Sequence, residues 1–121
     1  MDTIFQPTKR NTLTSNTLST AAVEIERPAR YGKQLVNHLR RKSGGEWDAQ
    51  TESGWVNLSG DTATVVAAGG QLTLTVDGPE ENIERLEDIV GRHLVGFARK
   101  LQIDIRWTRS DGSEGTRQVS A

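Results

Sequence analysis

Four short segments with strand character follow one another between residues 46 and 76. Glycine-containing turns separate them, and glycine readily adopts the positive φ that tight hairpins need. Strands this close in sequence tend to pair with their neighbours, so the region predicts an antiparallel meander. The four segments are residues 46–52, 55–58, 63–68 and 71–76.

Two amphipathic helices flank this meander. The first is predicted from Pro28 to about Lys42, because proline suits a first helical turn and glycines follow the segment. The second is predicted to begin near Pro79, where Asp77 or Gly78 can cap it. Apolar residues recur every three or four positions and mark the buried stripes. They are Tyr31, Leu35, Val36 and Leu39 in the first helix and Ile83, Leu86, Val90, Leu94 and Phe97 in the second.

One further strand is predicted near each end of the chain, because residues 20–26 and 101–107 alternate between apolar and polar side chains. The element order is then β-α-β-β-β-β-α-β. One antiparallel sheet with both helices on a single face buries both apolar stripes around a shared core. We therefore predict an α+β fold of two layers.

The length of 121 residues suits one domain. We predict that this single α+β domain spans residues 19–107. Residues 1–18 are polar and lack a sustained apolar period, and residues 108–121 are rich in serine, glycine and aspartate. Such segments bury little apolar surface, so we predict a disordered N-terminal tail and a flexible C-terminal tail.

Composition and motifs exclude several classes of function. The sequence has no cysteine, which excludes thiolate chemistry and fits a reducing compartment. No apolar run is long enough for a secretory signal or a membrane helix, so we expect a cytoplasmic protein without a membrane partner. No phosphate-binding glycine motif or nucleophile elbow appears, so we predict no enzyme and no cofactor. The tryptophans in predicted strands are interpreted as packing residues: Trp47, Trp55 and Trp107.

Both histidines of the chain lie at the edge of a predicted apolar stripe. His38 follows Leu35 by three residues, and His93 follows Val90 by three. We expect the two imidazoles to border one cleft, with Tyr31 on its floor and Lys42 beside it. The alternative is two structural histidines that donate hydrogen bonds to carbonyl groups. A carboxylate such as Glu87 could complete a metal site, but no dense ligand motif selects a metal, and we predict none.

The first helix is strongly basic. Between Arg27 and Gly45 the sequence has six cationic residues and no acidic one. Four of them are predicted on the helix face away from Leu35 and Leu39, where they could bind phosphate or carboxylate groups. The alternatives are an ordinary solvated face or ion pairs with the acidic second helix. The four residues are Arg30, Lys33, Arg40 and Arg41. Nucleic acid is not an expected partner, because the net charge is −1.

Two stretches resemble a known family. ARYGKQLVNH at residues 29–38 and RLEDIVGRHLVGFA at residues 85–98 are similar to the bacterial domain of unknown function DUF2218. Members of that family commonly have a second histidine where this chain has Arg41. The resemblance implies the same fold, and the association of some members with siderophore-interacting flavin reductases implies iron handling.

These observations together favour a small binding or accessory domain. We expect it to bind an anionic or an iron- or siderophore-related small molecule. The alternative is a protein-interaction module that docks on a partner such as a reductase. The sequence leaves the oligomeric state open.

Overall fold

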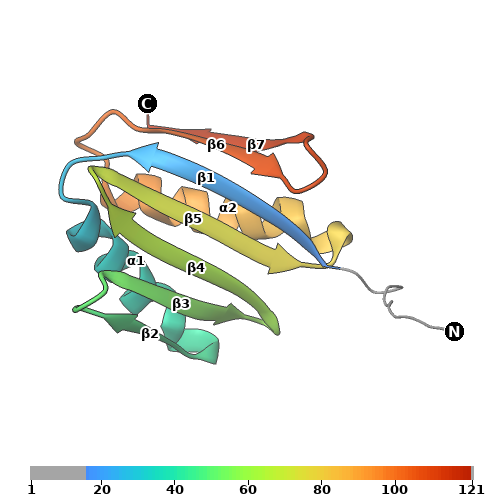
Figure 1. Cartoon of the computed structure of the whole chain (residues 1–121), viewed down its shortest axis with the longest axis horizontal. Coiled ribbons are helices and arrows are strands. Elements are labelled where there is room, and N and C mark those ends of the chain that lie inside the picture. Colours follow the sequence, from blue (N-terminus) through green and yellow to red (C-terminus); the bar gives the residue numbers. More distant parts are fainter. Residues whose placement is uncertain (1–15, 121) are drawn as a thin grey trace, which may run out of the picture.

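A single antiparallel sheet carries both helices on one face in the computed structural model, which describes residues 16–120 (Figure 1). The described part of the chain contains seven strands and two helices. In chain order they are β1 (Thr17–Glu24), α1 (Pro28–Ser43), β2 (Gly45–Asp48), β3 (Ser53–Leu58), β4 (Asp61–Ala68), β5 (Gln71–Gly78), α2 (Glu80–Phe97), β6 (Asp104–Arg109) and β7 (Glu114–Val119).

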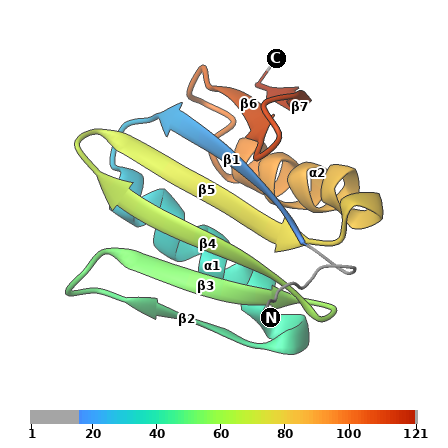
Figure 2. The ribbon, with the colours of Figure 1, turned by 45° about the vertical axis from the view of Figure 1, so that its right-hand side comes forward.

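The strands are arranged in the order β2-β3-β4-β5-β1-β6-β7. Strands β2 to β5 form the predicted meander, and β1 lies between β5 and β6 (Figure 2). Thr20 of β1 is opposite Thr75 on one side and Thr108 on the other. The predicted fold class is confirmed, and the predicted order is confirmed for the first eight elements.

The ninth element, β7, is a correction to the predicted flexible C-terminal tail at residues 108–121. Residues 114–119 pair with β6 and close the sheet at one edge. The strand lacks a hydrophobic face, and side-chain hydrogen bonds connect it to the rest of the domain. Trp107 Nε1 donates a hydrogen bond of 2.7 Å to Gln118 Oε1, and Thr116 binds a carboxylate of α2. The pairing is local, since only residues 110–113 separate the two strands, but residues 114–119 lack the apolar alternation by which the other strands were predicted.

The N-terminal boundary also differs from the prediction. Strand β1 begins at Thr17, so the ordered domain starts before residue 19. Residues 17 and 18 pair with the end of β5, which continues through Gly78. Most of the predicted disordered tail, residues 1–15, lies outside the described residues.

The core lies between the sheet and the helices. Helix α1 covers β2, β3 and β4, whereas α2 covers β7, β5 and β1. Leu35 and Val36 of α1 and Ile83 and Leu94 of α2 are fully buried, as their spacing predicts. Burying each such side chain contributes about 1.5–3 kcal/mol. Burial of the two apolar stripes therefore stabilises the packing of both helices on one face of the sheet.

The two helices begin and end close to the predicted positions, but the residue that caps α2 differs from the prediction. Helix α1 starts at Pro28 as predicted and ends before Gly44, whose φ of 102° favours glycine. Helix α2 is preceded by Pro79 as its N-cap residue. The predicted caps Asp77 and Gly78 instead belong to β5, because their backbone pairs with β1.

The three tryptophans have different environments. Trp107 is buried in the core and Trp47 packs partly against it. Trp55, with 46% of its surface exposed, lies on the open face of the sheet. None of the three lines the pocket between the helices.

Candidate functional site between the two helices

A pocket of about 450 Å³ lies between the C-terminal half of α1, the helix α2 and the turn that joins β3 to β4. Its floor is apolar, with side chains from both helices and from β3. Its rim is polar and includes Ser43, Asn57 and Ser59. The floor consists of Leu39, Leu58, Leu86 and Ile89.

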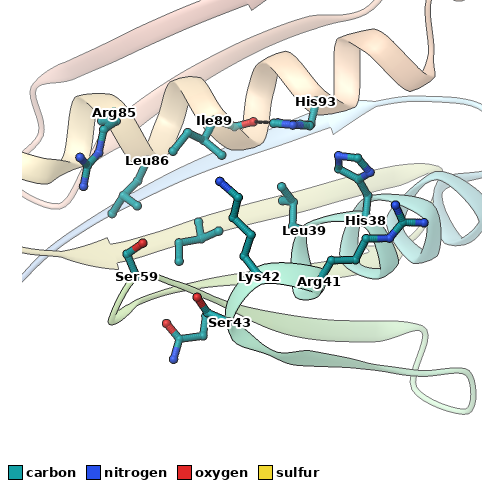
Figure 3. Close-up of a pocket in the computed structure, with 12 residues that line it drawn as sticks. His38, Leu39, Arg41, Lys42, Ser43, Ser59, Arg85, Leu86, Ile89 and His93 are labelled. Carbon is teal, nitrogen blue, oxygen red and sulfur yellow. Dashed lines mark hydrogen bonds between the residues drawn. The ribbon is translucent and has the colours of Figure 1, made fainter.

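Three cationic side chains surround this apolar floor. Arg41 and Lys42 come from the end of α1, and Arg85 comes from α2. Figure 3 shows the Lys42 side chain extending into the space between the helices. No carboxylate of the described chain lines the pocket. No ion pair within residues 16–120 involves any of the three cations. The pocket therefore has a positive local charge in a molecule whose net charge is −1.

The two histidines meet at one end of the pocket. The ring centroids of His38 and His93 are 5.0 Å apart, with an angle of 40° between the ring planes. His38 also packs edge-on against Phe97, with centroids 5.4 Å apart. The sequence prediction that both imidazoles border one cleft agrees with this placement, since both line the pocket.

One backbone contact orients the His93 ring. Its Nδ1 lies 2.6 Å from the carbonyl oxygen of Ile89, one helical turn earlier (Figure 3). A carbonyl oxygen only accepts hydrogen bonds, so Nδ1 carries the proton and donates it. In the neutral ring, Nε2 then keeps a lone pair that can accept a hydrogen bond or bind a metal.

Several neighbours favour the neutral form of His38. Burial lowers the pKa of His38 from its usual 6.5, and the nearby His93 and Arg41 lower it further. The first effect is desolvation of the imidazolium, and the others are repulsion by positive charge. The folded protein therefore favours the neutral imidazole of His38 over the imidazolium.

The structure brings together four of the predicted site residues. His38, His93 and Lys42 line the pocket, as does Arg41. Arg41 was predicted on the opposite helix face, which is wrong. It follows His38 by three residues, one helical turn, so the two share a face.

The other predicted site residues lie elsewhere. Arg30, Lys33 and Arg40 are exposed and do not line the pocket. Tyr31, predicted on the cleft floor, packs instead against the core and is absent from the pocket lining. It precedes His38 by seven residues, about 10 Å along the helix axis. The predicted floor position is therefore wrong.

Glu87 is unsuited to the role of metal ligand that the sequence suggested for it. Its side chain is fully buried and forms an ion pair of 3.0 Å with Arg109. Within the described residues, no group of three or more histidine, cysteine, aspartate or glutamate side chains can hold a metal ion. Ion pairs between the basic helix and the acids of α2, one of the alternatives that the sequence left open, are not found among residues 16–120.

Sequence reasoning missed Arg85 as a site residue. It precedes Ile89 by four residues and His93 by eight, so all three lie on one face of α2. That spacing was a usable signal. The contribution of the β3–β4 turn had no comparable signal, because the turn reaches the pocket only through the pairing of the sheet.

The fold and the pocket define a small two-layer α+β domain with a cationic, histidine-bordered cavity between its helices. Residues 20–108 match the model of the family described as an uncharacterized protein conserved in bacteria, DUF2218. The chain belongs to this family, which confirms the resemblance drawn from its two helices. Comparison with curated proteins and with solved structures found no match. Among residues 16–120, no helix is long and apolar enough to cross a membrane.

Proposed function

We propose that this domain binds an anionic small molecule with an apolar part in the pocket between α1 and α2. The observation that carries the proposal is the pairing of three cations with an aliphatic floor, without a lining carboxylate in the described chain. Unpaired cations beside apolar surface favour a ligand that supplies both negative charge and apolar surface. The proposed role is binding rather than catalysis.

The size of the pocket supports a small ligand. Its volume of about 450 Å³ lies within the roughly 300–1,000 Å³ of small-molecule sites. Asn57 and Ser59 add side chains that can donate and accept hydrogen bonds at the rim. An iron- or siderophore-related ligand, which the family resemblance implied, is a narrower form of this proposal. The absence of cysteine fits a cytoplasmic location for the activity.

The proposal is tested by calorimetric titration with naphthalene-2-carboxylate and with its neutral primary amide. The two probes have the same apolar body and differ in charge. We expect the carboxylate to bind more tightly. Lys42→Ala should weaken its binding by about tenfold or more, because a hydrogen bond to a charged group contributes roughly 1.5–3 kcal/mol.

Lys33→Ala is the matched control, since Lys33 is an exposed lysine of the same helix outside the pocket. It should leave the affinity unchanged. Equal affinity for the carboxylate and the amide, or equal losses in the two lysine variants, would refute the proposal. Failure of both compounds to bind would also count against it.

A further inference from the structure

The two imidazoles stand at a separation that suits joint binding of one metal ion. A histidine nitrogen binds a divalent transition metal at about 2.0–2.1 Å, which puts the ion about 3.2 Å from the ring centroid. For ligand angles of about 90–109°, two such rings lie roughly 4.5–5.2 Å apart between centroids. The observed distance of 5.0 Å between His38 and His93 lies within that range.

The surroundings of His93 match those of a metal-binding histidine. Such a residue usually donates its second ring N–H to a carbonyl or a carboxylate, which sets the tautomer and orients the ring. The bond from Nδ1 of His93 to the carbonyl of Ile89 has this form. It leaves Nε2 as the donor atom toward a metal.

The rest of the site disfavours a bare cation. The described residues offer no third ligand near the two histidines. Arg41, Lys42 and Arg85 place three positive charges around the cavity, and these repel a free dication. A metal ion enters favourably only if it brings anionic ligands that cancel its charge and pair with those cations.

We infer that the pocket binds a divalent transition metal as an anionic polycarboxylate chelate. His38 and His93 fill two open positions on the metal, while the carboxylates of the chelator pair with the cations of the pocket. Imidazole ligands suit Zn²⁺, Ni²⁺ and Cu²⁺. This inference rests on the proposed function, because it names the chemical class of the anionic ligand.

Nickel nitrilotriacetate is a suitable probe, because this anionic complex leaves two adjacent coordination positions open. The untagged chain is titrated calorimetrically with the complex, with Ni²⁺ alone and with nitrilotriacetate alone. We expect the complex to bind more tightly than either component. His38→Ala and His93→Ala should each lower its affinity by at least about tenfold. Loss of a residue that only supports a metal ligand already costs about 10–100-fold in affinity, so loss of a ligand itself should cost no less.

A second readout separates coordination from simple anion binding. The chain has only two histidines, so paramagnetic Ni²⁺ held by both should broaden both imidazole NMR signals together. His38→Phe, whose ring can pack against Phe97, replaces the alanine variant if the latter fails to fold. Lys33→Ala serves again as the control for Lys42→Ala and should bind the complex like the wild type.

The outcomes distinguish this inference from the proposed function. If free nitrilotriacetate binds as tightly as its nickel complex and the imidazole signals stay sharp, the anion site stands and the metal inference is overturned. Equal binding of free Ni²⁺ and the complex also overturns it. If neither the complex nor naphthalene-2-carboxylate binds, both proposals fail.

Discussion

Helix α2 presents charged or polar side chains to two neighbours, and the two arrangements differ. Toward β7 it buries Glu87, whose carboxylate accepts hydrogen bonds from Ser19, Arg109 and Thr116. Toward α1 it presents Arg85 and His93 to an open pocket. The first group of residues is fully paired within the protein, whereas the cations of the second have no ion-pair partner among residues 16–120.

The contrast indicates a structural role for the residues around Glu87 and supports the binding role proposed for the pocket. A buried charge is tolerated only when its hydrogen-bonding capacity is met, and Glu87 meets this condition within the fold. Its two oxygens link α2 to β1, β6 and β7. The pocket cations are exposed to solvent and have no ion-pair partner among residues 16–120. An incoming anion can therefore pair with them without breaking an existing ion pair.

Two glycines allow the close packing on the β7 side. A Cβ at Gly91 would collide with the side chain of Gln118, and a Cβ at Gly115 would collide with Glu87. A Cβ at Gly115 would also lie 2.8 Å from Cβ of Trp107. The hairpin of β6 and β7 therefore approaches α2 more closely than any side chain at these positions would allow.

The largest predicted effect is the loss of Glu87. Glu87→Ala leaves the Arg109 guanidinium without its partner and removes the bonds to Ser19 and Thr116. Removing one member of a buried ion pair costs about 3–5 kcal/mol, so we expect a loss of that size in the free energy of unfolding. Urea unfolding followed by circular dichroism measures it. The control is Glu81→Ala, at an exposed position on the same helix, which should change stability little. A similar loss in this variant would contradict the structural role of the Glu87 hydrogen bonds.

The next effect tests the close packing. Gly91→Ala forces Gln118 away from α2, and overpacking of this kind costs roughly 1–3 kcal/mol. Gly96→Ala is the matched control on the same helix, because nothing lies within 4 Å of its added Cβ. It should stabilise the protein by about 0.5–1 kcal/mol through helix propensity. Thermal unfolding of both variants compares them, and a neutral or stabilising Gly91→Ala would refute the close contact.

The pH dependence of stability should also reflect Glu87. Burial raises the pKa of Glu87, but hydrogen bonds from Arg109, Ser19 and Thr116 outweigh it and hold the pKa below its usual 4.5. The folded state therefore favours the carboxylate, and this stabilisation is complete above about pH 4.5. It is lost as the pH falls through the folded-state pKa.

Urea unfolding of the wild type and of Glu87→Gln between pH 7 and pH 3 tests this dependence. The stability difference between the two proteins should shrink below about pH 4.5. A difference that stays constant over the whole pH range would show that the charge of Glu87 does not contribute to the stability of the folded state.

The smallest predicted effect lies on the pocket side. Arg41→Ala removes one of the charges that lower the pKa of His38, so that pKa should rise toward 6.5. NMR titration of the imidazole protons measures the change, with His93→Ala used for assignment. Arg40→Ala, at a neighbouring exposed position outside the pocket, should shift the pKa less. Equal shifts in both variants would contradict the proximity of Arg41.

The sequence predicted the structure best where apolar residues recur at regular helical spacing. The stripes of both helices predicted their buried residues, and the histidines at the stripe edges were expected to border one cleft; both line the pocket. Arg41 shares the His38 face through its three-residue spacing, so its position was predictable but was misassigned. Tyr31 was misplaced because a shared stripe says nothing about how far along the helix the pocket extends.

The amino-acid sequence by itself determined the secondary structure of the meander, the two amphipathic helices and the family to which the chain belongs. These properties depend on residues within one or two turns of each other, so local spacing encodes them. Tertiary structure alone decided that the carboxylate of Glu87 is buried among partners from β1, β6 and β7, and that α2 and the end of α1 border one pocket. Each of these depends on partners far apart in the chain, and a polar side chain becomes a core residue only when folding brings its hydrogen-bonding partners to it.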